Sequence, residues 1–269
     1  MKGVLLCPPD HFDVVDVKNA FMKGHAGKVD RARARQQWDA LAKTFQGIGL
    51  KVERLLPTPG CEDMVFSANP TLTGLNAKGK KVAILSQMKH ASRQREVLAH
   101  RDWFAAHGYD VIESPVLFEG GGDATWHPGR RVIWGGYGQR SVEEAYLFVA
   151  RVFGVEALTL ELATDFYHLD TCFCPIDEKT VLLHPKAFTK AGLALIKRNF
   201  KTVIEADAAD ARERFACNAA VFGKHVVIQA GSTALEDKLK KHGCDVHRVE
   251  TGEFLKSGGS VYCMKQWLF

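Results

Sequence analysis

Strands and helices alternate along the whole of this chain, and that alternation limits the folds open to it. Helical periodicity marks five segments, at 30–47, 92–107, 141–153, 187–198 and 232–242. Short apolar runs, most of them rich in Val, Ile and Leu, predict strands at 3–7, 64–68, 82–86, 110–113, 131–135, 156–161, 180–184, 201–204, 224–229 and 245–249. Because no Pro/Ser-rich linker divides the chain, a single α/β domain over 1–269 is the simplest interpretation. The elements recur in units of about fifty residues without a readable sequence repeat, so the pattern alone establishes no repeat architecture.

The composition is that of an ordinary soluble globular protein, with 46% hydrophobic and 25% charged residues. No run approaches about eighteen apolar residues, so we expect no transmembrane helix, and residues 1–10 contain too short an apolar core for a signal peptide. The net charge is +5, but the basic residues are dispersed, and the densest group, Arg31, Arg33 and Arg35, is typical of a solvated helix face. We therefore expect neither a membrane nor a nucleic acid as a partner.

The cysteines indicate reduced thiols in a cytoplasm. There are seven of them, an odd number, and their spacing shows no disulfide framework. Cys172 and Cys174 would share one face of a strand, but no second pair of cysteines or histidines follows at ligand spacing, which argues against a zinc site. We expect neither a metal nor an organic cofactor.

Three reactive side chains lie on separate segments. Cys263 follows a glycine-bearing turn near the end of the chain, where a short apolar strand is expected, and His168 and Glu119 lie far upstream. Taken singly, each is more often structural: a buried thiol, a satisfied histidine at a strand edge, a carboxylate at a turn. Together, a thiol, an imidazole and a carboxylate are the components of a cysteine nucleophile with an oriented acid/base.

The glycines after Glu119 allow several interpretations. The run 119–123 has neither a Gly-Lys-Ser/Thr ending nor G-x-G-x-x-G spacing, so a phosphate loop is weakly indicated. It could be a simple turn, or it could let the backbone approach a ligand while presenting Glu119 to it.

Four ordered motifs resemble the guanidino-group-modifying superfamily, whose fold is the pentein. They are Asp-Met-Val-Phe-Ser-Ala-Asn at 63–69, Phe-Glu-Gly-Gly-Gly-Asp at 118–123, Tyr-His-Leu-Asp-Thr-Cys-Phe at 167–173 and Gly-Gly-Ser-Val-Tyr-Cys at 258–263. Residues 7–14 also look like the start of arginine dihydrolase catalytic domains. The resemblance implies a five-bladed α/β propeller of ββαβ units with pseudo-fivefold symmetry and a central active site. It also implies a single catalytic domain over the whole chain.

The resemblance implies roles for the reactive residues. A guanidinium carbon is a poor electrophile because its charge is delocalised, so it needs a strong nucleophile, carboxylates that fix its donors and an acid for the leaving amine. Cys263 would be the nucleophile, aided by a nearby cation that favours its thiolate. His168 would protonate the leaving nitrogen and then activate water, while Glu119 would orient His168 and favour its charged form. Asp170 would hold the guanidinium.

Four further residues match substrate-side positions of the superfamily. Arg93 and Arg140 would bind the amino-acid carboxylate, for which a bidentate guanidinium is suited, although either alone could be a surface charge. Asn69 stands where deiminases and dimethylaminohydrolases carry an aspartate. An amide can donate as well as accept, so it can also serve a neutral ureido group. Asn19 lies where arginine dihydrolases carry another asparagine, although both asparagines could simply satisfy turns.

The resemblance therefore favours arginine dihydrolase, which converts arginine to citrulline and then to ornithine at one site. A dimethylarginine dimethylaminohydrolase, an arginine deiminase and an amidinotransferase are the rival activities on the same scaffold. A non-catalytic arginine-binding or ribosome-associated pentein is the alternative of another class, but such relatives lose the cysteine that this chain keeps. The expected partner is a small-molecule substrate, and a homo-oligomer is compatible with the sequence.

Overall fold

Fifteen strands form five three-stranded sheets in the computed structural model, which describes residues 1–269. The strands are β1 (Gly3–Leu6), β2 (Lys51–Arg54), β3 (Thr71–Leu75), β4 (Lys81–Leu85), β5 (Asp110–Glu113), β6 (Ala124–Trp126), β7 (Val132–Tyr137), β8 (Glu156–Glu161), β9 (Phe173–Pro175), β10 (Thr180–Leu183), β11 (Thr202–Glu205), β12 (Ala220–Phe222), β13 (His225–Gln229), β14 (Asp245–Val249) and β15 (Lys265–Leu268). The α-helices are α1 (Arg31–Gly47), α2 (Ala91–Ala106), α3 (Gly120–Asp123), α4 (Ala145–Phe153), α5 (Lys190–Asn199), α6 (Ala208–Arg212), α7 (Thr233–Lys241) and α8 (Gly252–Leu255). Three short 3-10 helices are η1 (Ala20–Met22), η2 (Leu169–Thr171) and η3 (Pro185–Ala187).

Every sheet is built in the same way. Its middle strand pairs antiparallel with one neighbour and parallel with the other. One of the longer helices, α1, α2, α4, α5 or α7, lies in the connection between the two parallel strands, as a crossover between parallel strands requires. Five such units fit a pseudo-fivefold arrangement and explain the recurrence of about fifty residues in the sequence.

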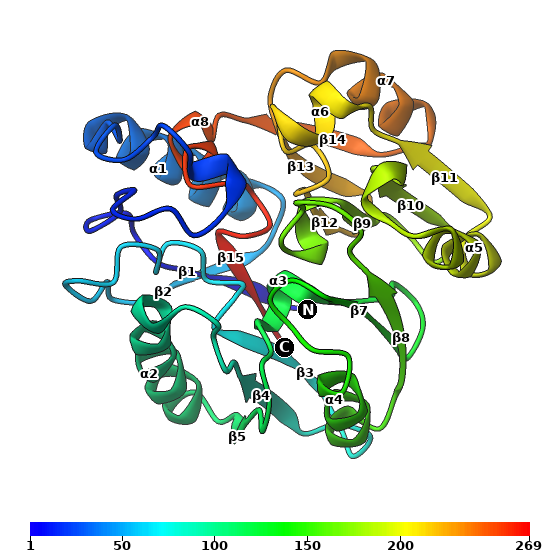
Figure 1. The fold of residues 1–269 in the computed structure, drawn as a ribbon, viewed down its shortest axis with the longest axis horizontal. Coiled ribbons are helices and arrows are strands. Elements are labelled where there is room, and N and C mark those ends of the chain that lie inside the picture. Colours follow the sequence, from blue (N-terminus) through cyan, green and yellow to red (C-terminus); the bar gives the residue numbers. More distant parts are fainter.

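The two ends of the described chain meet in one sheet. Four units use consecutive strands, but the fifth has the order β15-β1-β2. Strand β1 pairs antiparallel with β15, with Gly3 opposite Leu268. Figure 1 shows the units following one another around the molecule, with these five helices toward the outside and both chain ends near the middle.

Apolar side chains from distant segments fill the space between helices and sheets. Trp38 and Phe45 of α1 belong to one hydrophobic cluster with Val4 of β1, and the same cluster contains Val261 and Cys263. The segment that carries Cys263 is therefore packed into the core, because burying its apolar surface stabilises it there. No helix is long and apolar enough to cross a membrane.

The sequence placed the longer elements well and missed the shortest ones. Helix α1 begins where predicted, because the Asp30 carboxylate caps it by accepting from the backbone N–H of Arg33 at 3.0 Å. Helix α4 begins later than the predicted 141–153 segment, since the Ser141 hydroxyl donates to Asp123 instead of capping a helix. The strands that were missed, β2, β3, β6 and β12, have only three to five residues each. A strand was expected around Cys172 and Cys174, where β9 lies, and the strand expected at Cys263 begins two residues later as β15.

Two predictions about the site segments were wrong. Residues 64–68 form turns rather than a strand, with the Phe66 N–H donating to the Asp63 carbonyl and the Ala68 N–H donating to the Cys263 carbonyl. The apolar side chains of this run are buried although they belong to no sheet. Cys263 lies in the turn before β15 and not in the strand itself, so two irregular segments meet at the thiol.

Candidate active site

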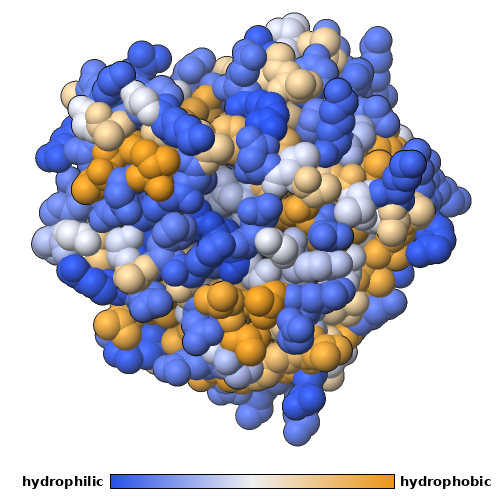
Figure 2. Space-filling model, viewed as in Figure 1, coloured by the Kyte–Doolittle hydropathy of each residue, from blue (hydrophilic) through white to orange (hydrophobic).

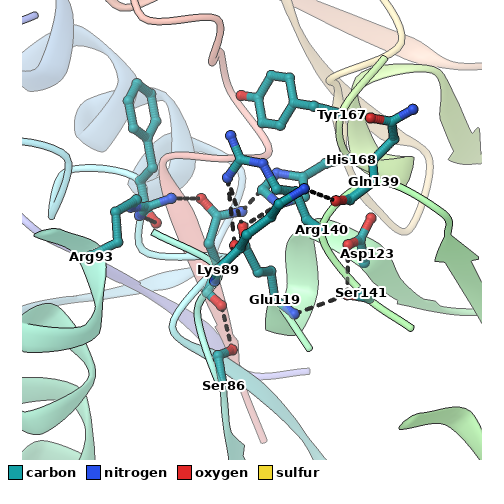
Figure 3. Close-up of polar contacts among 12 residues, drawn as sticks. Ser86, Lys89, Arg93, Glu119, Asp123, Gln139, Arg140, Ser141, Tyr167 and His168 are labelled. Atoms are coloured by element: carbon teal, nitrogen blue, oxygen red, sulfur yellow. Dashed lines mark hydrogen bonds and ion pairs between the residues drawn. The ribbon is translucent and has the colours of Figure 1, made fainter. Parts of the chain in front are cut away.

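Glu119 is the centre of a buried polar network. Its side chain has no exposed surface, and it accepts from the Lys89 backbone N–H at 2.9 Å, from Arg140 Nη1 at 3.1 Å and from His168 Nε2 at 2.7 Å. Its own N–H donates to the Ser141 hydroxyl at 3.0 Å. Figure 3 shows Glu119 between Lys89, Arg140 and His168. Since Lys89, Arg140 and His168 come from three separate segments, the carboxylate holds several parts of the chain together.

The charges of this network favour an ionised Glu119 beside a neutral His168. Burial opposes ionisation of Glu119, but His168, Arg140 and Arg93 outweigh it and hold the pKa of Glu119 below its ordinary value. Burial lowers the pKa of His168 to about 4, although Glu119 raises it. Glu119 does favour the charged imidazole, as predicted, but burial opposes this effect and outweighs it. A carboxylate accepts hydrogen bonds, so Nε2 carries the proton and Nδ1 is left as the free acceptor.

Acidification should destabilise the folded protein, because the fold keeps His168 neutral. The folded protein resists protonation of His168 down to about pH 4, whereas the unfolded chain takes up the proton near 6.5. The contribution of His168 to the free energy of unfolding is therefore fully present above pH 6.5 and is lost as the pH falls toward 4. About 2 kcal/mol of it should be lost between pH 7 and pH 5. Denaturant unfolding at both pH values measures it, with His168→Gln as the control that cannot titrate. An equal pH dependence in both proteins would contradict the prediction.

Asn69 lies between an arginine and the histidine. Arg93 Nη1 donates to Asn69 Oδ1 at 2.8 Å, and Asn69 Nδ2 lies 3.4 Å from His168 Nδ1. The guanidinium of Arg93 also pairs with Glu96, at 2.8 Å from Nη2. Because the arginine fixes the amide oxygen, the amide nitrogen of Asn69 is directed toward the free acceptor of the imidazole.

The glycine run after Glu119 serves close packing of the site itself. A Cβ at Gly122 would lie 2.3 Å from Asn69 Nδ2 and 3.0 Å from His168 Nδ1. No side chain fits there without displacing both groups. Residues 120–123 form the short helix α3 rather than a simple turn. The glycines allow a close backbone approach, as one of the interpretations expected, but the groups approached are the protein side chains Asn69 and His168.

Cys263 faces Asp170 at the second half of the site. The thiol Sγ lies 3.1 Å from Asp170 Oδ2, and both residues are buried. Burial raises the pKa of Asp170 to about 7, and burial together with the Asp170 charge raises the pKa of the Cys263 thiol well above its ordinary value. Asp170 lies in η2, directly after His168, so one short turn presents both the imidazole and the carboxylate.

A buried lysine lies two residues beyond the thiol. The Lys265 side chain has no exposed surface, and its Nζ has no hydrogen-bond partner. The amine lies 3.1 Å from the centre of the Tyr262 ring and 4.6 Å from that of Trp267, an arrangement in which ring faces attract a cation. Burial lowers the pKa of Lys265 well below its ordinary value, against the pull of Asp170 and Cys263.

Four of the five predicted substrate-side residues, Asn19, Asn69, Arg93 and Arg140, line one small cavity. Tyr167 also contributes to its wall, whereas the fifth predicted residue, Asp170, does not. The hydrophilic centre of the molecular face in Figure 2 overlies the region where the ribbons of the units converge in Figure 1. A wider hollow, lined among others by Trp126, Phe173 and Tyr262, lies elsewhere and contains none of the predicted site residues.

Arg140 and Asn19 already have protein partners in this cavity. Besides Glu119, Arg140 donates from Nη2 to the Lys18 carbonyl at 2.9 Å, and its guanidinium lies over the Tyr167 ring. Asn19 caps η1 through its Oδ1 and donates to the Ser257 carbonyl at 3.1 Å. The contacts of Asn19 are thus those of a residue that satisfies a turn. Its position in the cavity wall also places it beside any molecule bound there.

Some residues of the site were not identified from the sequence. Asn218 contacts both Cys263 and Asp170, yet it precedes a short apolar run like many loop asparagines. Lys265 gave no signal other than its nearness to Cys263. No group of three or more His, Cys, Asp or Glu side chains is placed to hold a metal ion.

Comparison with known proteins gives consistent relatives. The family described as N,N dimethylarginine dimethylhydrolase, eukaryotic, matches residues 8–269. The bifunctional arginine dihydrolase/ornithine cyclodeaminase ArgZ of Synechocystis is 36% identical over 97% of this chain, but the chain spans only 37% of that protein. The N(G),N(G)-dimethylarginine dimethylaminohydrolase of Mycobacterium tuberculosis is 32% identical over 96% of this chain and 83% of its own length.

The solved structures agree with this. The N-terminal domain of ArgZ, as a cysteine-to-serine mutant bound to substrate, is 35% identical, with a TM-score of 0.93 over 98% of this chain and 96% of that one. An asparagine-to-serine mutant of the same domain, covalently bound to a reaction intermediate, has a TM-score of 0.92 over 97% of this chain and 96% of that one. Together with the family match over nearly the whole length, these findings confirm the superfamily that the motifs indicated. The chain belongs to the dimethylarginine dimethylaminohydrolase family of the pentein superfamily.

Proposed function

We propose that this protein is a cysteine-dependent hydrolase of guanidino and ureido C–N bonds, with arginine dihydrolase as its activity. The observation that carries the proposal is the buried pairing of Cys263 with Asp170 and of His168 with Glu119 around one short turn. The named activity of ArgZ, over the part of it that this chain resembles, supports the choice of reaction.

In the first step the Cys263 sulfur would form a bond to the guanidinium carbon. The free site disfavours a thiolate, because burial and Asp170 raise the pKa of Cys263. A guanidinium bound against Asp170 brings the positive charge that offsets this penalty. As the C–S bond forms, the thiol proton would pass to Nδ1 of His168. The imidazolium would then give this proton to a terminal nitrogen as its bond to carbon breaks, which releases ammonia and leaves a thiouronium adduct.

In the second step water would replace the sulfur. The free Nδ1 of His168 would take a proton from water, which attacks the adduct carbon as the C–S bond breaks, giving citrulline. Attack of Cys263 on the ureido carbon would then expel a second ammonia. Hydrolysis of the carbamoyl thioester would yield ornithine and carbon dioxide.

Asn69 would decide whether the second round occurs. Its oxygen is held by Arg93, so its nitrogen is the group available beside His168. An amide N–H can donate to a neutral ureido oxygen, whereas a carboxylate accepts only. The ArgZ structure in which an asparagine-to-serine mutant is bound to an intermediate supports a role for an asparagine in turnover.

Asn69→Asp should convert the enzyme into one that stops at citrulline. The carboxylate still pairs with a cationic guanidinium, so arginine should be consumed, but at neutral pH it cannot donate to a ureido group. A time course of arginine, citrulline, ornithine and ammonia for both proteins measures this. Wild-type protein should form ornithine from arginine and from citrulline, and the variant should accumulate citrulline.

The same time course decides between the rival activities. The family match and the mycobacterial relative favour dimethylarginine as the second candidate substrate. Release of dimethylamine with no action on arginine would replace the dihydrolase proposal by that rival. A wild type that stops at citrulline would indicate a deiminase, and transfer of the amidino group to an added amine would indicate an amidinotransferase.

We also propose that the five units close into a five-bladed propeller with this site at its centre, forming one catalytic domain over 1–269. The sheet shared by β1 and β15 supports closure, because it joins the first unit to the last segment. In this proposal Arg93 and Arg140 bind the substrate carboxylate and Asn19 assists from η1. The protein would act in the cytoplasm on a small-molecule substrate.

A further inference from the structure

Asn218 joins the Cys263 thiol to the backbone of Asp170 through its side chain. Its Nδ2 donates to Cys263 Sγ at 3.1 Å and to the Asp170 carbonyl at 3.0 Å. Its Oδ1 accepts from the backbone N–H groups of Ser260 at 3.1 Å and Cys263 at 3.2 Å. These four bonds use both donors and both acceptor sites of the carboxamide, and the residue has no exposed surface.

The orientation of this amide follows from its neighbours. Backbone N–H groups only donate, so the atom that faces Ser260 and Cys263 must be the oxygen. The NH₂ group therefore faces the sulfur. A hydrogen bond to the charged form of an acid favours that form, and in agreement the bond from Asn218 lowers the pKa of Cys263 against the effect of burial.

The segment that carries Asn218 is itself held firmly. The Asn218 N–H donates to the Phe215 carbonyl at 2.9 Å, and the Asn218 carbonyl accepts from the Tyr262 N–H at 3.0 Å. Phe215 is the one non-glycine residue with a positive φ, at 47°, and its buried ring packs against Phe21 at 4.7 Å between centroids. Such a backbone persists only where the surroundings impose it.

We propose that Asn218 is a positioning residue that stabilises the Cys263 thiolate and fixes the nucleophile turn relative to Asp170. This inference rests on the proposed role of Cys263. The negative charge of Asp170 disfavours a thiolate at Cys263. The neutral Asn218 amide offsets this effect by donating a hydrogen bond to the sulfur. Since the donor is anchored by two backbone N–H groups, it is in place before any substrate binds.

Alkylation of Cys263 tests this without turnover. Each protein is treated with iodoacetamide from pH 6 to pH 10, and the modified Cys263 peptide is quantified by mass spectrometry against a Cys263→Ser background. Asn218→Asp keeps the acceptor for both backbone N–H groups but turns an oxygen toward the sulfur. We expect the rate of alkylation at each pH to fall at least about tenfold, as a rise of about one unit in the pKa of the thiol would produce.

Two further variants make the result decisive. Asn218→Ala removes the donor without adding a charge, and it should lower the rate of alkylation as well, so it also serves if Asn218→Asp does not fold. Asn199→Asp is the matched control, because Asn199 bonds Arg130 and the Leu195 carbonyl away from the site, and its alkylation should equal that of wild type.

An unchanged rate of alkylation in a folded Asn218 variant would overturn the inference. Such a result leaves the proposed function standing as long as Cys263→Ser is inactive. Conversely, full turnover by Cys263→Ser would remove the proposed function, whatever the alkylation profile of the Asn218 variants.

Discussion

Replacing Cys263 with serine is expected to abolish turnover of arginine and citrulline while the fold survives. The sulfur is the only strong nucleophile among the predicted site residues, and a serine hydroxyl is far harder to ionise, the more so in a buried place beside Asp170. The loss of transition-state stabilisation should be at least ~3 kcal/mol, which is more than a hundredfold in rate. Product assays with purified protein measure it, and circular dichroism and thermal unfolding check the fold.

Cys244→Ser is the matched control for this substitution. Cys244 is half-buried and lies just before β14, away from the polar network. Its replacement should leave turnover near the wild-type rate. If the Cys263→Ser protein also turned over at that rate, the assignment of the nucleophile would be refuted.

His168→Ala and Glu119→Gln should each slow turnover strongly, with the histidine the greater loss. His168 provides the atom that moves protons, whereas Glu119 acts on it through one hydrogen bond of 2.7 Å. The two effects should not add in the double mutant, because the carboxylate can orient only an imidazole that is present.

Steady-state rates for both single mutants and the double mutant test the coupling. Glu119→Gln also leaves the buried Arg140 without its carboxylate, and breaking a buried ion pair costs several kcal/mol of stability. Thermal unfolding of each protein therefore has to accompany the kinetics, to ensure that folded enzyme is compared. Independent, additive effects would show that the two residues do not act as a unit.

The sequence allowed good prediction of elements whose pattern is local. The 3.6-residue periodicity and the Asp30 cap located α1, and buried runs such as 180–184 matched strands within a residue or two. Short strands such as β6, with three residues, contain too few positions to show a period. The run 64–68 was misassigned because its apolar residues are buried by turns around Cys263, which no local pattern reveals.

The same distinction applies to the site. The motif residues Glu119, His168, Asp170 and Cys263 could be grouped through the resemblance, and the structure does bring them into two contacting pairs. Asn218 could not be found, because its significance lies in bonds to residues 42 to 48 positions away in the chain. The fold brings such distant residues together, and the residues next to Asn218 in the sequence do not indicate these contacts.

The pairing of β1 with β15 has a consequence for how activity develops during folding. Gly3 and Leu268 are separated by almost the full length of the chain, and contacts at such separation form late because loop-closure entropy opposes them. The nucleophile lies two residues before β15, in the turn that this pairing anchors. In refolding experiments, we expect helical structure to return first, and both protection of the Cys263 thiol and catalysis to return together in the slowest phase.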